Sequence, residues 1–321
     1  MALKEMTIML EPATQGFLDA LAAQGGKPIY KLPYAEARQV LEDAQAGAVA
    51  RPEVDVEDKV FPVGPAGKVA VRIFRPLGKK EQLPAVMYFH GGGWILGSKD
   101  THDRYMREIT EASGAAFVFV NYTPAPEGQY PAQIEEGYAA TKYVAENAKE
   151  LGFDANRLAI GGDSAGGCLS AAVTILAKER GGPALRYQLL YYPVTDSSMA
   201  TASYQEFAEG PWLTKAAMTW FWDAYVPNMA DREKSTAAPL KATQKELAGL
   251  PPTLVIVDEN DVLRDEGEAY AKKLMRAGVA VTVVRYLATI HDFVMLNALA
   301  DTLATKSAIA LGAQTLKKVL A

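Results

Sequence analysis

One serine in this chain has glycine neighbours in a pattern typical of a nucleophile. The apolar run 158–160 ends at two glycines, and Ser164 follows one aspartate later. After Ala165, two more glycines lead into a helix-like run, 168–180. A Gly-x-Ser-x-Gly segment between a strand and a helix forms a sharp turn that exposes the serine hydroxyl at the end of the strand. Glycine-rich turns also bind phosphates, but the Lys-Ser or Lys-Thr of a P-loop is absent here and Gly-x-Gly-x-x-Gly is not matched. The pattern therefore predicts a nucleophilic serine.

A second glycine-rich segment follows another apolar run. Residues 84–89 predict a buried strand, and His90, three consecutive glycines (91–93) and Trp94 come next. Backbone N–H groups that no side chain obstructs can stabilise a tetrahedral oxyanion, and each such donor typically contributes about 10²–10³ in turnover. The alternative is a flexible turn. Beside Ser164, the segment favours an oxyanion-stabilising loop.

The chain has only three histidines that could serve as the base. His90 lies inside the glycine segment, where we expect it to shape the loop through hydrogen bonds. His102 lies in a polar helix start and is expected to be a solvated surface residue. His291 follows the strand-like run 281–287 and is the only histidine after Ser164. Because the chain order in folds with such a turn is Ser, then Asp or Glu, then His, His291 is the predicted base.

Four carboxyl groups follow the strand-like run 253–257 and could orient the imidazole: Asp258, Glu259, Asp261 and Asp265. Asp258 is barely out of the strand, and Asp265 falls at the next helix start, where carboxylates serve as caps. Asp261 lies in the loop between them. Position favours Asp261, although spacing alone leaves the others open.

Taken together, these segments resemble the bacterial hormone-sensitive-lipase-like (family IV) carboxylesterases of the α/β-hydrolase fold. The resemblance rests on Gly162-Asp163-Ser164-Ala165-Gly166 with His90-Gly91-Gly92-Gly93 upstream, on residues 121–127 with Tyr130-Pro131, and on residues 261–266. It covers the chain from about residue 60 to the end. The first fifty residues match only as a generic helical segment.

The resemblance implies a serine hydrolase that cleaves short- to medium-chain carboxylic esters without a cofactor. Ser164 would be the nucleophile, His291 the base and Asp261 its orienter. Oxyanion donors would come from the N–H groups of Gly92, Gly93 and Ala165. The alternative is a deacetylase, lactonase or amidase with the same triad. A less favoured one is a non-catalytic small-molecule receptor on this scaffold.

Two residues near His291 depart from the family pattern. Ala288 and Asp292 stand where members often have glycine. If position 288 needs a positive φ, alanine carries backbone strain there. The Asp292 carboxylate would raise the proton affinity of the imidazole, unless it is a solvated loop residue.

Strand-like and helix-like segments alternate along most of the chain. Strands are predicted at 69–75, 85–89, 116–121, 158–160, 187–192, 253–257 and 281–287, and helices at 133–149, 165–180, 266–277 and 301–320. Apolar strands that alternate with helices predict a mostly parallel sheet covered on both faces. Because His90, Ser164, Asp261 and His291 all follow strands, one edge of the sheet collects them.

Two stretches interrupt this alternation. The resemblance implies that residues 1–50 and 197–247 form a helical cap over a catalytic core of residues 51–196 and 248–321. Three tryptophans are candidates for lining a substrate pocket: Trp94, beside the glycine segment, and Trp212 and Trp220 in the insertion. The alternative is that such an aromatic cluster belongs to the core.

Composition excludes several classes of protein. The chain has 321 residues, 49% of them hydrophobic, and a net charge of -5, with no basic stripe for nucleic acid. Its only cysteine, Cys168, is expected to be a buried core thiol. We expect no metal site, no signal peptide, no membrane insertion and a cytoplasmic location. The partner would be a small-molecule ester. The edge strand 281–287 is a candidate homodimer seam, unless the cap buries it.

Overall fold

The computed structural model describes residues 8–321, and it contains an eight-stranded sheet. Residues 1–7 lie outside the described part. They begin the predicted cap segment 1–50, and the expectation of no signal peptide rests on them. The strands are β1 (Val54–Phe61), β2 (Val69–Pro76), β3 (Leu83–Phe89), β4 (Ala116–Asn121), β5 (Phe153–Asp163), β6 (Gln188–Tyr191), β7 (Thr253–Asn260) and β8 (Val281–Ile290).

Their spatial order is β1-β2-β4-β3-β5-β6-β7-β8. The β1–β2 and β2–β4 pairs are antiparallel, and every pair from β4–β3 to β7–β8 is parallel. The central strands β3, β4 and β6 are buried almost throughout, as continuous apolar runs require in a sheet covered on both faces. This confirms the mostly parallel sheet that the sequence predicts.

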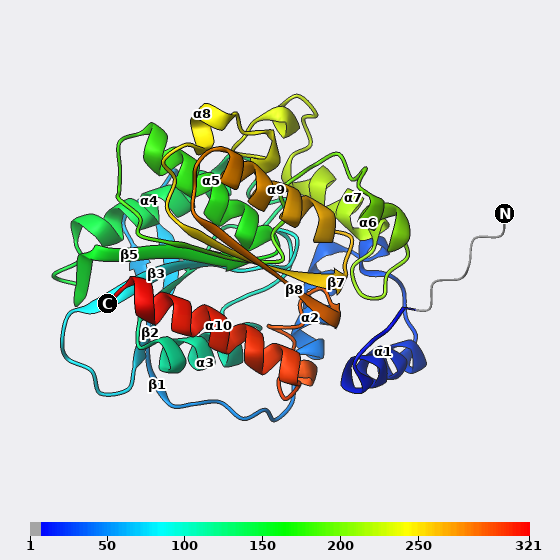
Figure 1. Ribbon diagram of the computed structural model, residues 1–321. Helices are drawn as coiled ribbons and strands as arrows, with labels where there is room; N and C mark the ends of the chain where they lie inside the picture. Colours follow the sequence, from blue (N-terminus) through cyan, green and yellow to red (C-terminus); the bar gives the residue numbers. More distant parts are fainter. Residues whose placement is uncertain (1–7) are drawn as a thin grey trace.

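Helices cover both faces of the sheet, as Figure 1 shows. Helices α3 (Asp103–Ser113) and α10 (Leu303–Val319) pack together on one face, and α4 (Ala132–Glu146), α5 (Ala165–Glu179) and α9 (Arg264–Arg276) cover the other. Helix α5 is buried over nearly its whole length, which explains its unbroken run of apolar and small residues.

Of the remaining helices, all but the last in chain order come from the two stretches that interrupt the alternation. They are α1 (Pro12–Gln24), η1 (Ile29–Lys31), α2 (Tyr34–Ala44), α6 (Ala202–Glu206), α7 (Lys215–Tyr225), η2 (Asp231–Glu233), η3 (Pro239–Lys241), α8 (Gln244–Leu247) and η4 (Asn297–Leu299), the last of these lying after β8. Helices α1, α2, α6 and α7 gather at the end of the molecule where β7 ends (Figure 1), whereas α8 packs beside α5 and α9.

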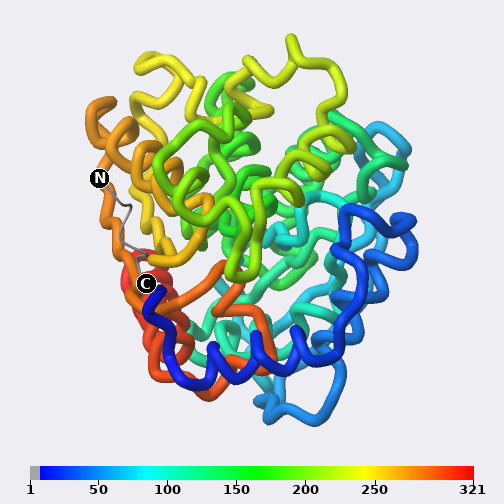
Figure 2. The backbone as a smooth tube through the Cα atoms, turned by 90° about the vertical axis from the view of Figure 1, so that its right-hand side faces the viewer, coloured from blue at the N-terminus to red at the C-terminus, as the bar shows by residue number. Residues whose placement is uncertain are grey.

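Aromatic contacts join the amino-terminal helices to the insertion. The rings of Phe17 and Trp212 lie 5.4 Å apart, and Tyr34 stacks on Trp220 at 5.3 Å. Figure 2, which faces this end, shows the blue amino-terminal segment and the green to yellow-green insertion both lying toward the viewer. The two stretches therefore come together over the carboxyl ends of the parallel strands.

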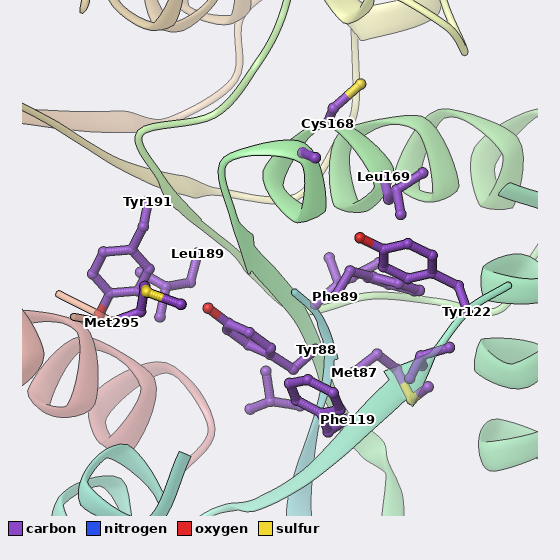
Figure 3. Packing of buried hydrophobic residues seen from close by; sticks show 14 of the residues in the cluster. Met87, Tyr88, Phe89, Phe119, Tyr122, Cys168, Leu169, Leu189, Tyr191 and Met295 are labelled. Carbon is purple, nitrogen blue, oxygen red and sulfur yellow. The ribbon is translucent and has the colours of Figure 1, made fainter. Parts of the chain in front are cut away.

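The core beneath this end is aromatic on both sides of the sheet. Tyr88 stacks on Phe119 at 6.1 Å between centroids, and its hydroxyl points toward Tyr191 (Figure 3). The next residue, Phe89, points to the other face, below Leu169 of α5. This alternation follows from the period of two in a strand.

Strand β1 was missed by the sequence analysis for a physical reason. Its sequence is rich in charge and its middle residues are exposed, with only Val54 and Phe61 buried. Edge strands in soluble proteins often have such charges because the charges oppose pairing with another chain. An edge strand of this kind therefore lacks the apolar pattern that revealed the others.

Candidate active site

Three predicted residues from distant parts of the chain meet at the carboxyl edge of the sheet. The His291 Nε2 atom lies 2.9 Å from the Ser164 Oγ atom, and the Nδ1 atom lies 2.8 Å from Asp261 Oδ2. All three side chains are almost completely buried. Such a serine–histidine–carboxylate relay can remove the hydroxyl proton while the carboxylate fixes the imidazole tautomer.

Ser164 occupies the turn between β5 and α5. Its φ of 53° lies in the left-handed region, which is strained for a residue with a side chain. Backbone contacts hold it there, since its N–H donates to the Tyr191 carbonyl at 2.9 Å. A Cβ at Gly166 would collide with the Phe89 backbone, so only glycine lets helix α5 approach β3 this closely.

The structure separates the four candidate carboxyl groups after β7. Asp261 bonds His291 and also accepts the Leu263 N–H at 3.0 Å, which fixes its carboxylate. Asp265 accepts the N–H of Ser203 at 2.8 Å, and Glu259 accepts that of Ala288 at 2.7 Å. Of these four carboxyl groups, Asp261, which its position in the loop favoured, is the one that bonds His291. Asp258 is also buried near the imidazole, a placement that its position at the strand end did not predict.

The loop that carries His291 has two residues in the left-handed region. Ala288 has φ 60° and Asp292 has φ 67°, so the strain expected at position 288 is present. Two hydrogen bonds hold this loop. Asn260 Nδ2 donates to the Thr289 carbonyl oxygen at 3.0 Å, and the Glu11 N–H donates to the Ala288 carbonyl oxygen at 3.0 Å.

The carboxylate of Asp292 lies on the serine side of the imidazole. Its Oδ1 atom is 3.5 Å from His291 Nε2, and its Oδ2 accepts the Trp212 indole N–H at 3.0 Å. Burial disfavours a charged imidazole, but Asp261 and Asp292 outweigh it and raise the pKa of His291 to about 9. Burial raises the pKa of Asp292 as well, against the opposing effects of His291 and Trp212. The expected effect of Asp292 on the imidazole is therefore present, and the solvated alternative is wrong.

The glycine segment after β3 presents free backbone donors beside the serine. Within residues 8–321, no protein acceptor is found for the N–H groups of Gly92, Gly93 or Ala165. Gly92 and Gly93 have φ of 102° and 60°, and a Cβ at Gly93 would collide with the ring of Phe221 in α7. This arrangement suits the stabilisation of an oxyanion.

The expectation that His102 is a solvated surface residue is wrong. Its side chain is fully buried, with Nε2 3.2 Å from Asp163 Oδ2 and Nδ1 2.9 Å from Thr101 Oγ1. Asp163 also accepts the Tyr88 hydroxyl at 2.7 Å and the Gly91 N–H at 3.1 Å. A polar sequence around a helix start does not reveal that the helix packs inward against a buried carboxylate. These contacts fix the start of the glycine segment.

His90 shapes the same segment, as expected. Its Nδ1 atom lies 2.8 Å from the Gly91 carbonyl oxygen, and its ring stacks between Tyr122 and Phe119. Burial and the neighbouring His102 lower the pKa of His90 to about 3, so it is neutral at physiological pH. Cys168, one turn after the serine, is the buried core thiol that the sequence predicts.

The predicted pocket tryptophans lie in different surroundings. Trp94 is fully buried and packs against Trp222 and Tyr225, with centroids 4.9 and 4.2 Å away. Trp212 reaches Asp292, whereas Trp220 is partly exposed and stacks on Tyr34 at 5.3 Å. Only Trp212 is thus linked to the His291 loop by a direct hydrogen bond.

Sequence analysis missed two aromatic residues at the site. Tyr192, just after β6, lies edge-on to His291 with ring centroids 4.9 Å apart. Phe221 contacts Gly93. Tyr192 directly follows strand β6, as the three predicted site residues follow their strands. This position in the sequence could have indicated that Tyr192 lies at the site. Nothing in the sequence of α7 distinguishes Phe221 from its aromatic neighbours.

One group of side chains in residues 8–321 has the composition and spacing of metal ligands: Asp258, Asp261 and His291, whose ligand atoms lie within 4.8 Å of one another. The Nδ1 atom of His291 is held by Asp261.

Two surface hollows, of about 420 and 360 Å³, are lined by residues outside this group and outside the triad. No helix in the described residues is long and apolar enough to cross a membrane.

A Ser–His–Asp relay at the carboxyl edge of a mostly parallel, doubly covered sheet defines an α/β-hydrolase. A family model described as "alpha/beta hydrolase fold" matches residues 86–295, and the chain belongs to this family. A thermostable esterase from Pseudomonas putida ECU1011 has 47% identity and a TM-score of 0.96, with 98% of this chain and 99% of that chain covered.

Curated relatives agree with this assignment. Carboxylesterase NlhH of Mycobacterium tuberculosis is 40% identical over 245 residues, which cover 76% of each chain. An ethyl acetate hydrolase of Pseudomonas putida is 32% identical over 91% of this chain and 94% of its own. The chain is a carboxylic ester hydrolase.

Proposed function

We propose that Ser164, His291 and Asp261 cleave small carboxylic esters through an acyl-serine intermediate. The observation that carries the proposal is the pair of hydrogen bonds, 2.8 and 2.9 Å long, that joins the three residues in the order of a catalytic relay.

In the first half-reaction, the Ser164 Oγ atom attacks the ester carbonyl carbon while its proton passes to His291 Nε2. Asp261 holds the Nδ1 proton and stabilises the imidazolium that forms. The carbonyl π electrons move onto oxygen, where the N–H groups of Gly92, Gly93 and Ala165 would bind the oxyanion. When the tetrahedral intermediate collapses, the bond to the alcohol breaks and the alcohol takes the proton from Nε2.

The second half-reaction repeats these steps with water. His291 takes a proton from water, the resulting hydroxide attacks the acyl carbon, and collapse restores the Ser164 hydroxyl and releases the acid. No step requires an electron donor or a bound metal, because acid–base exchange at one imidazole balances both halves.

Short to medium acyl chains are the substrates we favour. Helices α6 and α7 with α1 and α2, within the proposed cap segments 1–50 and 197–247, cover the carboxyl edge above a serine that is only 4% exposed. We propose that Trp94, Trp212 and Trp220 limit the acyl pocket, with Trp212 nearest the base because it bonds Asp292. A covered site of this kind disfavours long chains.

Initial rates on p-nitrophenyl esters of increasing acyl length test the proposal. We expect turnover that peaks at short chains and falls at least about 10⁴-fold in Ser164→Ala. The exposed Ser307→Ala is the matched control, and it should retain wild-type rates. Turnover that persists in a folded Ser164→Ala would refute the assigned nucleophile.

The same measurement separates the alternatives. Amides, lactones and acetylated sugars, assayed beside the esters, identify an amidase, lactonase or deacetylase if any of them has a higher kcat/KM than every ester. A folded wild-type protein that binds these compounds without turnover would indicate a small-molecule receptor instead.

The edge strand β8 is a proposed seam between two copies. Its outer side is only partly covered, and Leu287 is 60% exposed. Light scattering should give twice the chain mass for the wild type, and Leu287→Lys should shift it to the monomer. A monomeric wild type would refute the seam. The cytoplasmic location and the bacterial branch of the family stay predictions, which cell fractionation and the genome of the source organism check.

A further inference from the structure

Asp258, near the end of β7, has a buried carboxyl group without a hydrogen-bond partner. Its side chain is fully buried, and within residues 8–321 neither oxygen finds a partner. An unpaired carboxyl group in the interior is costly, and proteins rarely retain one without a reason. The catalytic steps described above do not use it.

This carboxyl group faces the imidazole of His291. Asp258 Oδ2 lies 3.9 Å from Nδ1, the nitrogen that Asp261 Oδ2 holds at 2.8 Å. The ligand-type atoms of all three side chains lie within 4.8 Å of one another. The Nδ1–H group therefore has one carboxyl group at hydrogen-bond distance and a second, three residues earlier in sequence, about 1 Å farther away.

The two groups do not compete in the intact site. Burial, followed by the charges of Asp261 and Asp292, raises the pKa of Asp258 well above its usual range, so the neutral acid is favoured. Within residues 8–321, the titratable groups around the Asp258 carboxyl are Asp261 after β7, His291 and Asp292 after β8, and Tyr192 after β6. Burial is the main cause of the raised pKa of Tyr192, and the charge of Asp258 contributes to it. Removal of the Asp261 charge would favour ionisation of Asp258.

We propose that Asp258 is a reserve positioning residue, which takes over the Nδ1–H of His291 when Asp261 is absent or turned away. The inference rests on the proposed role of His291 as the base. To form a normal hydrogen bond, the Asp258 carboxylate has to approach Nδ1 by about 1 Å, which a tilt of the imidazole or of the carboxyl group can supply. The ionised Asp258 then holds the tautomer and stabilises the imidazolium, as Asp261 does in the intact site.

A double-mutant cycle on kcat/KM tests the inference. We expect Asp258→Asn alone to stay within about twofold of wild type. Asp261→Ala should lose about 10²-fold, less than the about 10⁴-fold typical when the orienting acid is disabled. The double variant should lose at least tenfold more than Asp261→Ala. As a matched control, the exposed Asp301→Asn added to Asp261→Ala should change nothing further.

A pH profile distinguishes this role from a structural one. In Asp261→Ala, activity should rise with pH as Asp258 ionises, and this rise should be missing in the double variant. Proton NMR should show a downfield Nδ1–H signal in Asp261→Ala that disappears in the double variant. If Asp261→Ala fails to fold, Asp261→Ser, which keeps an oxygen for the Leu263 N–H, replaces it.

Equal kcat/KM and equal pH profiles for Asp261→Ala and the double variant would overturn the inference. Failure of the proposed function would look different. In that case His291→Ala or Ser164→Ala would retain activity, whatever residue stands at position 258.

Discussion

Replacement of Asp292 by asparagine should move the pH dependence of activity toward lower pH. The Asp292 carboxylate lies 3.5 Å from His291 Nε2. In the proposed mechanism this atom accepts the serine proton, so it has to be unprotonated. Because the pKa of His291 is raised to about 9, activity should increase with pH up to that value. Asparagine tolerates the left-handed φ of this position and keeps an oxygen for the Trp212 indole, so the substitution removes mainly the charge.

The size of the effect follows from the distance and the burial. Two unit charges 4 Å apart interact with about 1 kcal/mol in water and about 4 kcal/mol near a protein surface. The side chain is largely buried, but burial also raises the pKa of Asp292 and so weakens its negative charge. We therefore take the lower part of this range, about 1–2 kcal/mol. One pKa unit corresponds to about 1.4 kcal/mol, so the pKa of His291 should fall by about one unit. At pH 7, the unprotonated fraction would then rise from about 1% to about 10%.

The assay is kcat/KM on a p-nitrophenyl ester between pH 5.5 and 10, since its acid limb reports the base in the free enzyme. We expect the acid limb of Asp292→Asn to lie about one pH unit below that of wild type. Trp212→Phe is the matched control, because it removes the indole hydrogen bond that Asp292→Asn keeps and leaves the charge of Asp292 in place. An acid limb that stays in place in Asp292→Asn would refute the electrostatic argument, and an equal shift in Trp212→Phe would assign it to the loop instead.

Three further substitutions test the site and its supports. Gly93→Ala should lower kcat/KM at least about 10²-fold in steady-state assays, because the methyl group collides with Phe221 and displaces an oxyanion donor; unchanged kinetics would contradict this role. Ala288→Gly should raise the free energy of unfolding by about 0.5–1 kcal/mol in urea, since relief of the left-handed strain exceeds the entropy that glycine adds to the unfolded chain; a loss of stability would refute the strain. His102→Ala should lower the free energy of unfolding by about 2–4 kcal/mol in the same assay, because it removes one of the buried hydrogen bonds to Asp163 and leaves a cavity where the ring was; a neutral result would show that water replaces the ring.

Much of the site could be predicted because its chemistry restricts the sequence strongly. A serine held at φ 53° needs glycines around it, and N–H groups aimed at an oxyanion need a segment without side chains, so both leave a pattern in one short stretch. His291 could be predicted as the base because no other histidine follows Ser164. The parallel strands were evident for a similar reason, since burial on both faces requires continuous apolar runs.

What the sequence did not reveal depends on packing between distant segments. His102 has polar neighbours in sequence, yet helix α3 turns it inward onto Asp163, sixty-one residues away. Phe221 comes beside Gly93 only because α7 folds over the carboxyl edge. The residue types near these positions would be the same whether the side chain were exposed or buried. No local sequence pattern could therefore have distinguished a buried side chain from an exposed one here.

In the proposed mechanism His291 first accepts the Ser164 proton and then donates a proton to the alcohol, and its surroundings affect these two steps differently. Asp261 stands at one nitrogen and Asp292 at the other, and both favour the imidazolium. In the proposed mechanism, an imidazole of high pKa takes the Ser164 proton readily, but the imidazolium that results is a weaker acid toward the departing alcohol. The arrangement therefore assists the attack on the ester more than the departure of the alcohol. Burial and these same two charges favour the neutral form of Asp258. In that form it adds no third charge beside the imidazole, so it does not raise the pKa of His291 further.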